Sequence, residues 1–136
     1  ASEPQALADE LAQELALLHR ADPNEIETTL LIHPQVLQDF RDYNDFLDVA
    51  DAVVAELGLE GELQVASFHP RYRFAGTRAD AVENFSNRSP HPTLHLLREA
   101  SIAQAVAAFP DAADIYERNI ETLRRLGVAG WRQLLA

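Results

Sequence analysis

Two short runs of β-prone residues, each followed by proline, flank one long helical periodicity, and this pattern constrains the fold most. Residues 28–33 and 63–69 contain no charged side chain and both end in histidine. Between them, apolar residues recur every three or four positions from residue 36 to residue 57, and Gly58 follows as a helix stop. Because a strand, a helix and a strand in succession are nearly always joined in parallel, we predict a βαβ unit.

Further helices are expected around this unit. Ser2, Pro4 and Gln5 predict a capped helix start, and leucines spaced by three and four continue that helix to about residue 19. Residues 92–109 and 111–126 are predicted helices, with a short helical turn at 131–135 and a long loop over 70–90. Two strands are too few for a stable sheet. A third strand is expected from residues 71–75, from a second chain or from a preceding segment.

The expected fold class is therefore α/β: a small, mainly parallel sheet with a βαβ unit, covered by helices, plus C-terminal helices. The chain has 136 residues, 47% of them hydrophobic, which fits a single domain over 1–136. Its longest uncharged stretches, residues 28–38 and 100–110, are shorter than a membrane-crossing helix needs. The acidic first segment does not resemble a secretory signal, so we expect a cytoplasmic protein.

The residue types that are missing exclude several chemistries. The sequence has no Cys, so a disulfide, a thiolate metal site and a cysteine nucleophile are excluded for this chain. All eleven basic residues are Arg, which excludes a lysine Schiff base and a P-loop lysine. The five glycines form neither a dinucleotide-binding G-x-G-x-x-G nor a G-x-S-x-G nucleophile elbow.

The net charge of −11 is unevenly distributed along the chain. Residues 1–66 hold fifteen acids and two arginines, whereas residues 67–136 hold seven acids and nine arginines. This acidity, together with the absence of Lys, argues against nucleic acid as a partner. Five arginines between residues 68 and 98 form a local basic segment. In the alternative interpretation, the two halves simply neutralise each other across the fold.

Candidate catalytic residues lie at the ends of the two predicted strands. His33 and His69 would meet at the carboxyl edge of a parallel sheet, where open α/β sheets bind ligands. Asp39, near the start of the following helix, could orient a histidine or act as a base. In the alternative interpretation, the His-Pro pairs only terminate strands, both imidazoles are bonded locally, and Asp39 is a helix cap.

A candidate anion site follows the second strand. The loop brings Arg71, Asn87, Arg88 and Ser89 toward the same edge and leads into the helix predicted from residue 92. A helix N-terminus beside arginines suits a phosphate or a carboxylate, with Arg88 as the clamp. Alternatively, Ser89 is an N-cap and Arg88 pairs with the acidic half of the chain.

A divalent metal site is a further alternative. His91, His95 and Glu99 are spaced by four residues, which would align them on one face of the predicted helix. The apolar residues around His95 favour a packing role for it instead, and the prediction therefore names no metal ligand.

Several segments together resemble the bacterial DUF1415 family of uncharacterised proteins: Thr-Thr-Leu-Leu-Ile-His-Pro at 28–34, Asp-Tyr-Asn-Asp-Phe-Leu at 42–47, Gln-Val-Ala-Ser-Phe-His-Pro at 64–70, Asn-Arg-Ser-Pro at 87–90 and Leu-His-Leu-Leu-Arg-Glu-Ala at 94–100. The resemblance covers nearly the whole chain. It implies no assigned activity, a preceding segment with a Cys-Pro-Phe motif, and an aromatic residue at the position of His91.

The preferred functional hypothesis is that the protein binds, and could turn over, an anionic small molecule at the carboxyl edge of the sheet. Whether it is an enzyme is left open, and the sequence names no cofactor. The alternative is a non-catalytic interaction or structural domain. An open sheet edge would also offer a place for a second copy of the chain.

Overall fold

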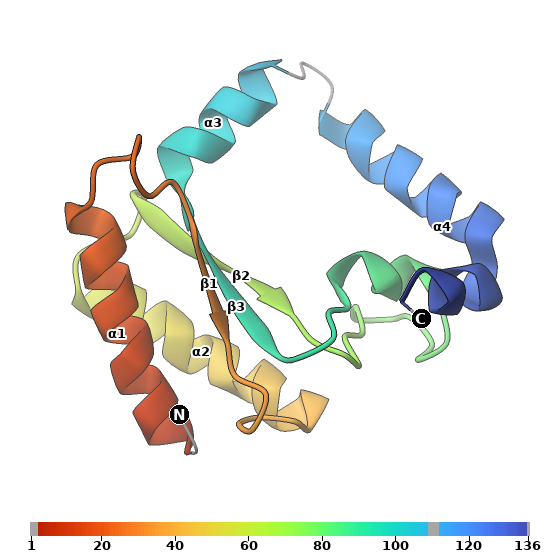
Figure 1. The fold of residues 1–136 in the computed structure, drawn as a ribbon, viewed down its shortest axis with the longest axis horizontal. Coiled ribbons are helices and arrows are strands. Elements are labelled where there is room, and N and C mark those ends of the chain that lie inside the picture. Colours follow the sequence, from red (N-terminus) through yellow and green to blue (C-terminus); the bar gives the residue numbers. More distant parts are fainter. Residues whose placement is uncertain (1–2, 109–111, 136) are drawn as a thin grey trace.

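The computed structural model describes residues 3–108 and 112–135. The elements follow in the order α1 (Pro4–Arg20), β1 (Thr29–Ile32), α2 (Phe40–Glu56), β2 (Leu63–Phe68), the 3-10 helix η1 (Val82–Asn87), β3 (Thr93–Arg98), α3 (Glu99–Ala108) and α4 (Ala112–Leu135). Figure 1 shows α1 and α2 beside the sheet, with α3 and α4 extending away from it.

The sheet is antiparallel, so the predicted mainly parallel sheet is wrong. Its order is β1-β3-β2, and β3 pairs in antiparallel fashion with both neighbours. β1 and β2 therefore run in the same direction, as the βαβ prediction required, but β3 lies between them. The prediction of a helix over residues 93–98 is the cause, since Leu94 and Leu96 alternate on the buried face of a central strand.

The third strand comes from β3 and not from residues 71–75; in the described chain that stretch forms no strand. Only the second half of the predicted helix 92–109 is helical, as α3. Phe109 and Asp111, at the ends of two predicted helices, lie outside the described residues. The predicted helix 111–126 and helical turn at 131–135 are parts of α4, which breaks at Gly127 (φ 65°, ψ 179°).

Two helix starts also differ from the prediction. α2 begins at Phe40 and not at residue 36, because Asp39 caps it by accepting hydrogen bonds from the backbone N–H groups of Arg41 and Asp42. The N-cap of α1 is Glu3, which makes no side-chain capping bond, whereas the predicted capped start begins at Ser2. Ser2 lies outside the described residues.

The core lies between one face of the sheet and the two helices α1 and α2. The predicted leucine stripe of α1 is fully buried: Leu7, Leu11, Leu15 and Leu18. α2 contributes Tyr43, Phe46, Ala50 and Val54, and the strands contribute Leu31, Leu94 and Leu96. The rest of α1 and α2 is exposed and acidic, which places much of the negative charge on one side of the sheet.

The opposite face of the sheet has little cover in the described chain. Leu30 and Ile32 of β1 are 58% and 54% exposed there. α3 starts directly after β3, and α4 packs on η1, so neither helix lies over this face (Figure 1). Among residues 3–108 and 112–135, no helix has both the length and the apolar character needed to cross a membrane.

Candidate functional site

His33 and His69 follow β1 and β2 directly, at the position that the sequence predicts. Their side chains are buried, with 2% and 0% of their surface exposed. Although β3 separates the two strands, both imidazoles pack against Tyr43, with ring centroids 5.9 Å away for His33 and 4.9 Å away for His69. The structure thus brings the two histidines together around one tyrosine.

Hydrogen bonds tie both imidazoles to the loop that joins β1 to α2. Nδ1 of His33 donates to the carbonyl of Val36 over 2.8 Å. Nδ1 of His69 accepts from the backbone N–H of Arg71, so its Nε2 carries the proton and donates to the carbonyl of Leu37 over 3.0 Å. Leu37 has a positive φ of 59°, an unfavourable backbone conformation for a leucine, and the histidine bonds hold it there.

Burial sets the protonation state of both histidines. Desolvation is the largest cause that lowers the pKa of His33 and of His69, and each also has a positive or ionisable neighbour that acts in the same direction. Both imidazoles are therefore neutral at pH 7. In the described chain, Nε2 of His33 is buried without a hydrogen-bond partner, which leaves it as an unused acceptor.

Asp39, the predicted base, caps α2, which is the role that the alternative interpretation gave it. It lies near the histidines, since Phe40 packs its ring edge against His69 at 5.4 Å. Arg71 lines a shallow exposed hollow together with Asp39 and Asp42. Arg71 and Asp39 are thus brought together, but Arg88 does not line this hollow.

The 70–90 segment is held by amide side chains. Asn87 donates from Nδ2 to the carbonyl of Ser67, and the backbone carbonyl of Asn87 accepts from the backbone N–H of His69. Asn84, fully buried, accepts from Phe74 N–H and from the Thr77 hydroxyl, and donates to a loop carbonyl. Asn84 could not be predicted from the sequence, because an asparagine in a long loop has no periodic pattern that marks it as buried.

Arg88 is fixed by three contacts. Its Nε donates to the carbonyl of Tyr72 over 3.1 Å and its Nη2 to the carbonyl of Ala79 over 2.6 Å. The guanidinium carbon lies 4.8 Å from the ring centroid of Phe85. These contacts close the loop and hold the guanidinium in one orientation. Ser89 donates to the carbonyl of His91 and stabilises the following turn.

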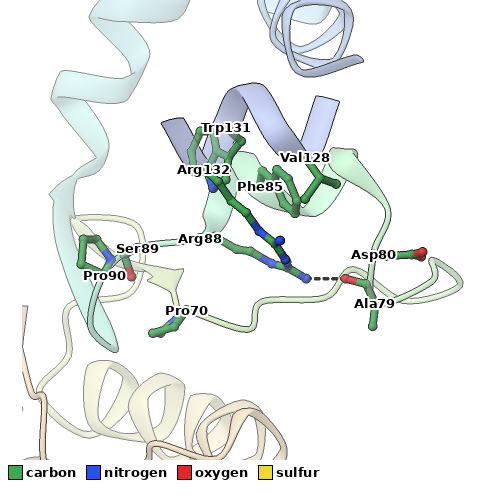
Figure 2. A pocket seen from close by; sticks show the side chains of 10 residues that line it. All are labelled: Pro70, Ala79, Asp80, Phe85, Arg88, Ser89, Pro90, Val128, Trp131 and Arg132. Atoms are coloured by element: carbon green, nitrogen blue, oxygen red, sulfur yellow. Dashed lines mark hydrogen bonds between the residues drawn. The ribbon is translucent and has the colours of Figure 1, made fainter. Parts of the chain in front are cut away.

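Arg88 and Ser89 line a pocket of about 510 Å³ between the 70–90 segment and the end of α4. Figure 2 shows its other walls, which include Phe85, Val128, Trp131 and Arg132. Trp131 and Arg132 follow the break at Gly127, which turns the last part of α4 over η1. These two residues could not be predicted as part of the site, because no sequence pattern relates them to Arg88.

The pocket carries an excess of positive charge. Both guanidinium groups, of Arg88 and Arg132, point into it (Figure 2). The acidic residue at its rim, Asp80, lies 3.4 Å from the guanidinium of Arg78. Within the part of the chain that the structure describes, neither Arg88 nor Arg132 forms an ion pair.

The helix that was expected to support an anion or a metal at this place is absent. β3 begins at Thr93, so the chain after Arg88 leads into a strand and not into the predicted helix. His91 lies in the turn before β3, His95 lies within the strand and Glu99 starts α3, so the predicted helical alignment of the three is wrong. Among the described residues, no group of three potential ligands is placed to hold a metal ion.

Comparisons with known proteins give a single assignment. A family model described as a protein of unknown function, DUF1415, matches residues 1–133, which confirms the resemblance found in the sequence. Neither a curated protein nor a solved structure matches the chain.

Proposed function

Since the chain belongs to the DUF1415 family, for which the family model records no function, we propose from the site itself that the protein binds an anionic small molecule in the pocket containing Arg88 and Arg132. The observation that carries the proposal is the pair of guanidinium groups in one mostly apolar pocket, without a carboxylate partner in the described chain. Two cations in such surroundings are stabilised by an anion placed between them.

Arg88 is suited to this role because it is already immobilised. A guanidinium has five N–H donors, and two of them are used by the carbonyls of Tyr72 and Ala79. The remaining donors keep a fixed direction, so little side-chain entropy is lost when a ligand binds. Arg132 is exposed and makes no such contact in the described chain, so it supplies the adaptable second cation.

One of the predicted catalytic residues, His69, borders this pocket through the backbone. Pro70 lines the pocket and directly follows His69. In this proposal, His33 and His69 hold the strand ends and the loop at Leu37 in place. A chemical step that uses His33, His69 or Asp39 stays a prediction, and so do ligand contacts from Asn87, Ser89 and Arg71.

Ligand-dependent thermal unfolding tests the proposal. Phosphate and sulfate should raise the unfolding midpoint of the full chain with the logarithm of their excess over the dissociation constant, and chloride at equal ionic strength should not. Arg132→Gln should remove most of this shift. Arg20→Gln, the same substitution at an exposed arginine far from the pocket, should leave it intact. A midpoint unchanged by either anion at millimolar concentration would contradict anion binding.

The alternative function, an interaction domain, has one supporting observation. The free face of the sheet exposes Leu30 and Ile32, and its other residues are uncharged: Gln64, Ala66, Phe68, Thr93, His95 and Leu97. The acidic α1 and α2 cover the other face, so no charged strand residue opposes a second copy on this one. Light scattering at increasing concentration tests this alternative, and Ile32→Thr should then lower the measured mass without affecting phosphate binding.

A further inference from the structure

The proposed pocket is larger and more apolar than a simple anion requires. Its volume of about 510 Å³ lies in the range of sites for organic ligands. Apart from the two arginines, most of its walls are apolar or aromatic, with Pro70, Pro90 and Val128 next to Phe85 and Trp131. An inorganic phosphate would occupy a small part of this space and would leave the apolar walls in contact with water.

The two aromatic rings of the pocket differ in their accessibility to a ligand. Phe85 is 4% exposed and already packs against Arg88 at 4.8 Å and against Trp131 at 5.4 Å between ring centroids. Trp131 is only half-buried. Its indole is therefore the aromatic surface that remains for a ligand, and Phe85 supports it from behind.

One helical segment places both the indole ring of Trp131 and the guanidinium of Arg132 in the pocket. Trp131 and Arg132 are consecutive residues on the short helical part that follows Gly127, and both line the pocket. Arg88 lies across the pocket on the 70–90 segment (Figure 2). A ligand with a flat ring joined to an anionic group would contact Trp131 with the ring while both guanidinium groups bind the anion.

We infer that the ligand of this pocket is an aromatic or heteroaromatic phosphate or carboxylate whose ring packs on Trp131; the inference rests on the anion site proposed above. Arg88 and Arg132 bind the acidic group, and Trp131 and Val128 contact the ring. Stacking on an aromatic side chain does not depend on which ring is present, so the pocket selects the class and not a single compound.

The fluorescence of Trp131 provides a direct test, since it is the only tryptophan of the sequence. With excitation at 295 nm, the full chain is titrated with phosphate, ribose 5-phosphate, phenyl phosphate, adenosine monophosphate and benzoate. Adenosine, which has a ring and no negative charge, completes the set. The ring-bearing phosphates should quench Trp131 and bind on the order of tenfold more tightly than phosphate and ribose 5-phosphate. Comparison of benzoate with phenyl phosphate then decides between a carboxylate and a phosphate.

Two variants of Trp131 separate the contribution of the aromatic ring to binding from that of the two arginines, with binding measured by calorimetry. Trp131→Leu keeps an apolar side chain but removes the ring, so phosphate should bind as before and the preference for phenyl phosphate should disappear. Trp131→Phe restores a ring and should restore much of the preference. An unchanged circular dichroism spectrum and retained phosphate binding show that each variant is folded.

The outcomes distinguish the two proposals. If phosphate binds and ring-bearing phosphates bind no better, the inference about the ring is overturned and the anion site stands. If Trp131→Leu keeps the preference, the contact with Trp131 is overturned. If none of the anions binds, both the anion site and the inference are wrong.

Discussion

Tyr43 is the residue on which the two strand ends and the two histidines converge. Its hydroxyl donates to the carbonyl of Thr93 over 2.8 Å and accepts from the backbone N–H of Phe68 over 3.0 Å. Its ring contacts both His33 and His69. Burial raises the pKa of Tyr43, so the hydroxyl stays protonated and continues to donate. A single side chain thereby links the ends of β2 and β3 to the candidate site.

Replacing Tyr43 by Phe should destabilise the protein by about 1–3 kcal/mol, because the buried N–H of Phe68 and carbonyl of Thr93 each lose a partner. Urea unfolding measures the difference in the free energy of unfolding. Tyr72→Phe is the matched control, since the hydroxyl of Tyr72 makes no hydrogen bond in the described chain, and its effect should stay within about 0.5 kcal/mol. Equal effects of the two substitutions would show that the hydroxyl of Tyr43 is dispensable.

The buried histidines predict a loss of stability on mild acidification. Burial lowers the pKa of His33, His69 and His95 in the folded protein below the value of 6.5 expected in the unfolded chain. Below pH 6.5 the unfolded chain therefore binds more protons, and the free energy of unfolding falls as the pH decreases toward the folded pKa values. Well above pH 6.5 the three imidazoles are neutral in both the folded and the unfolded chain, so they do not reduce the free energy of unfolding there.

Urea unfolding at pH 7.5, 6.5 and 5.5 checks this expectation in a range above the titration of most carboxylates. His69→Gln should reduce the pH dependence, because one of the buried titrating groups is removed. His91→Gln, at an exposed position, serves as the control and should keep the wild-type dependence. A free energy of unfolding that is constant between pH 7.5 and 5.5 would be incompatible with buried neutral histidines.

At the scale of elements, Arg98 joins the central strand to the end of α1. Nη2 of Arg98 donates to the carbonyls of Leu18, Ala21 and Ile26. The first two belong to the C-terminal end of α1, where the helix dipole favours a positive charge. The sequence predicts Arg98 within a helix and as part of a basic segment. Neither prediction indicates its contact with the end of α1.

Arg98→Ala should lower the free energy of unfolding by about 1–3 kcal/mol, because carbonyls at the end of α1 lose a charged donor. Hydrogen exchange should show faster opening of the last turn of α1 than of α2. Arg20→Ala removes an exposed arginine from that same turn and should cost less than about 0.5 kcal/mol. If both variants are equally stable, the contact of Arg98 contributes little.

At the scale of the whole molecule, the charge distribution predicts opposite salt effects on stability and on binding. The net charge is −11, and four exposed aspartates of α2 lie close along the chain: Asp42, Asp45, Asp48 and Asp51. Raising the ionic strength from about 10 mM to about 150 mM shortens the Debye length from about 30 Å to about 8 Å and screens this repulsion. The same screening weakens attraction between the two arginines and an anion.

The midpoint of thermal unfolding without ligand should therefore rise with sodium chloride, whereas the affinity for phosphate should fall. Calorimetry and thermal unfolding in the same buffers measure both. In the double variant Asp45→Asn and Asp48→Asn, the effect of salt on the midpoint should be smaller, while its effect on phosphate binding should be unchanged. An unfolding midpoint that decreases with salt in the wild type would contradict the proposed repulsion.

The sequence by itself determined the elements whose signals are local. The leucine stripe predicts α1, the uncharged runs predict β1 and β2 to within two residues at each end, and the His-Pro pairs place His33 and His69 at the strand ends. The family assignment also follows from the sequence, and the family model confirms it.

Only the tertiary structure decided the sheet and the pocket. Residues 93–98 fit helical spacing as well as strand alternation, and pairing with β1 and β2 selects the strand. Arg88 meets Trp131 and Arg132 because Gly127 breaks α4 and its last part packs beside η1. Strand pairing and helix packing are contacts between residues distant in sequence, and their free energy depends on burial that no local pattern contains.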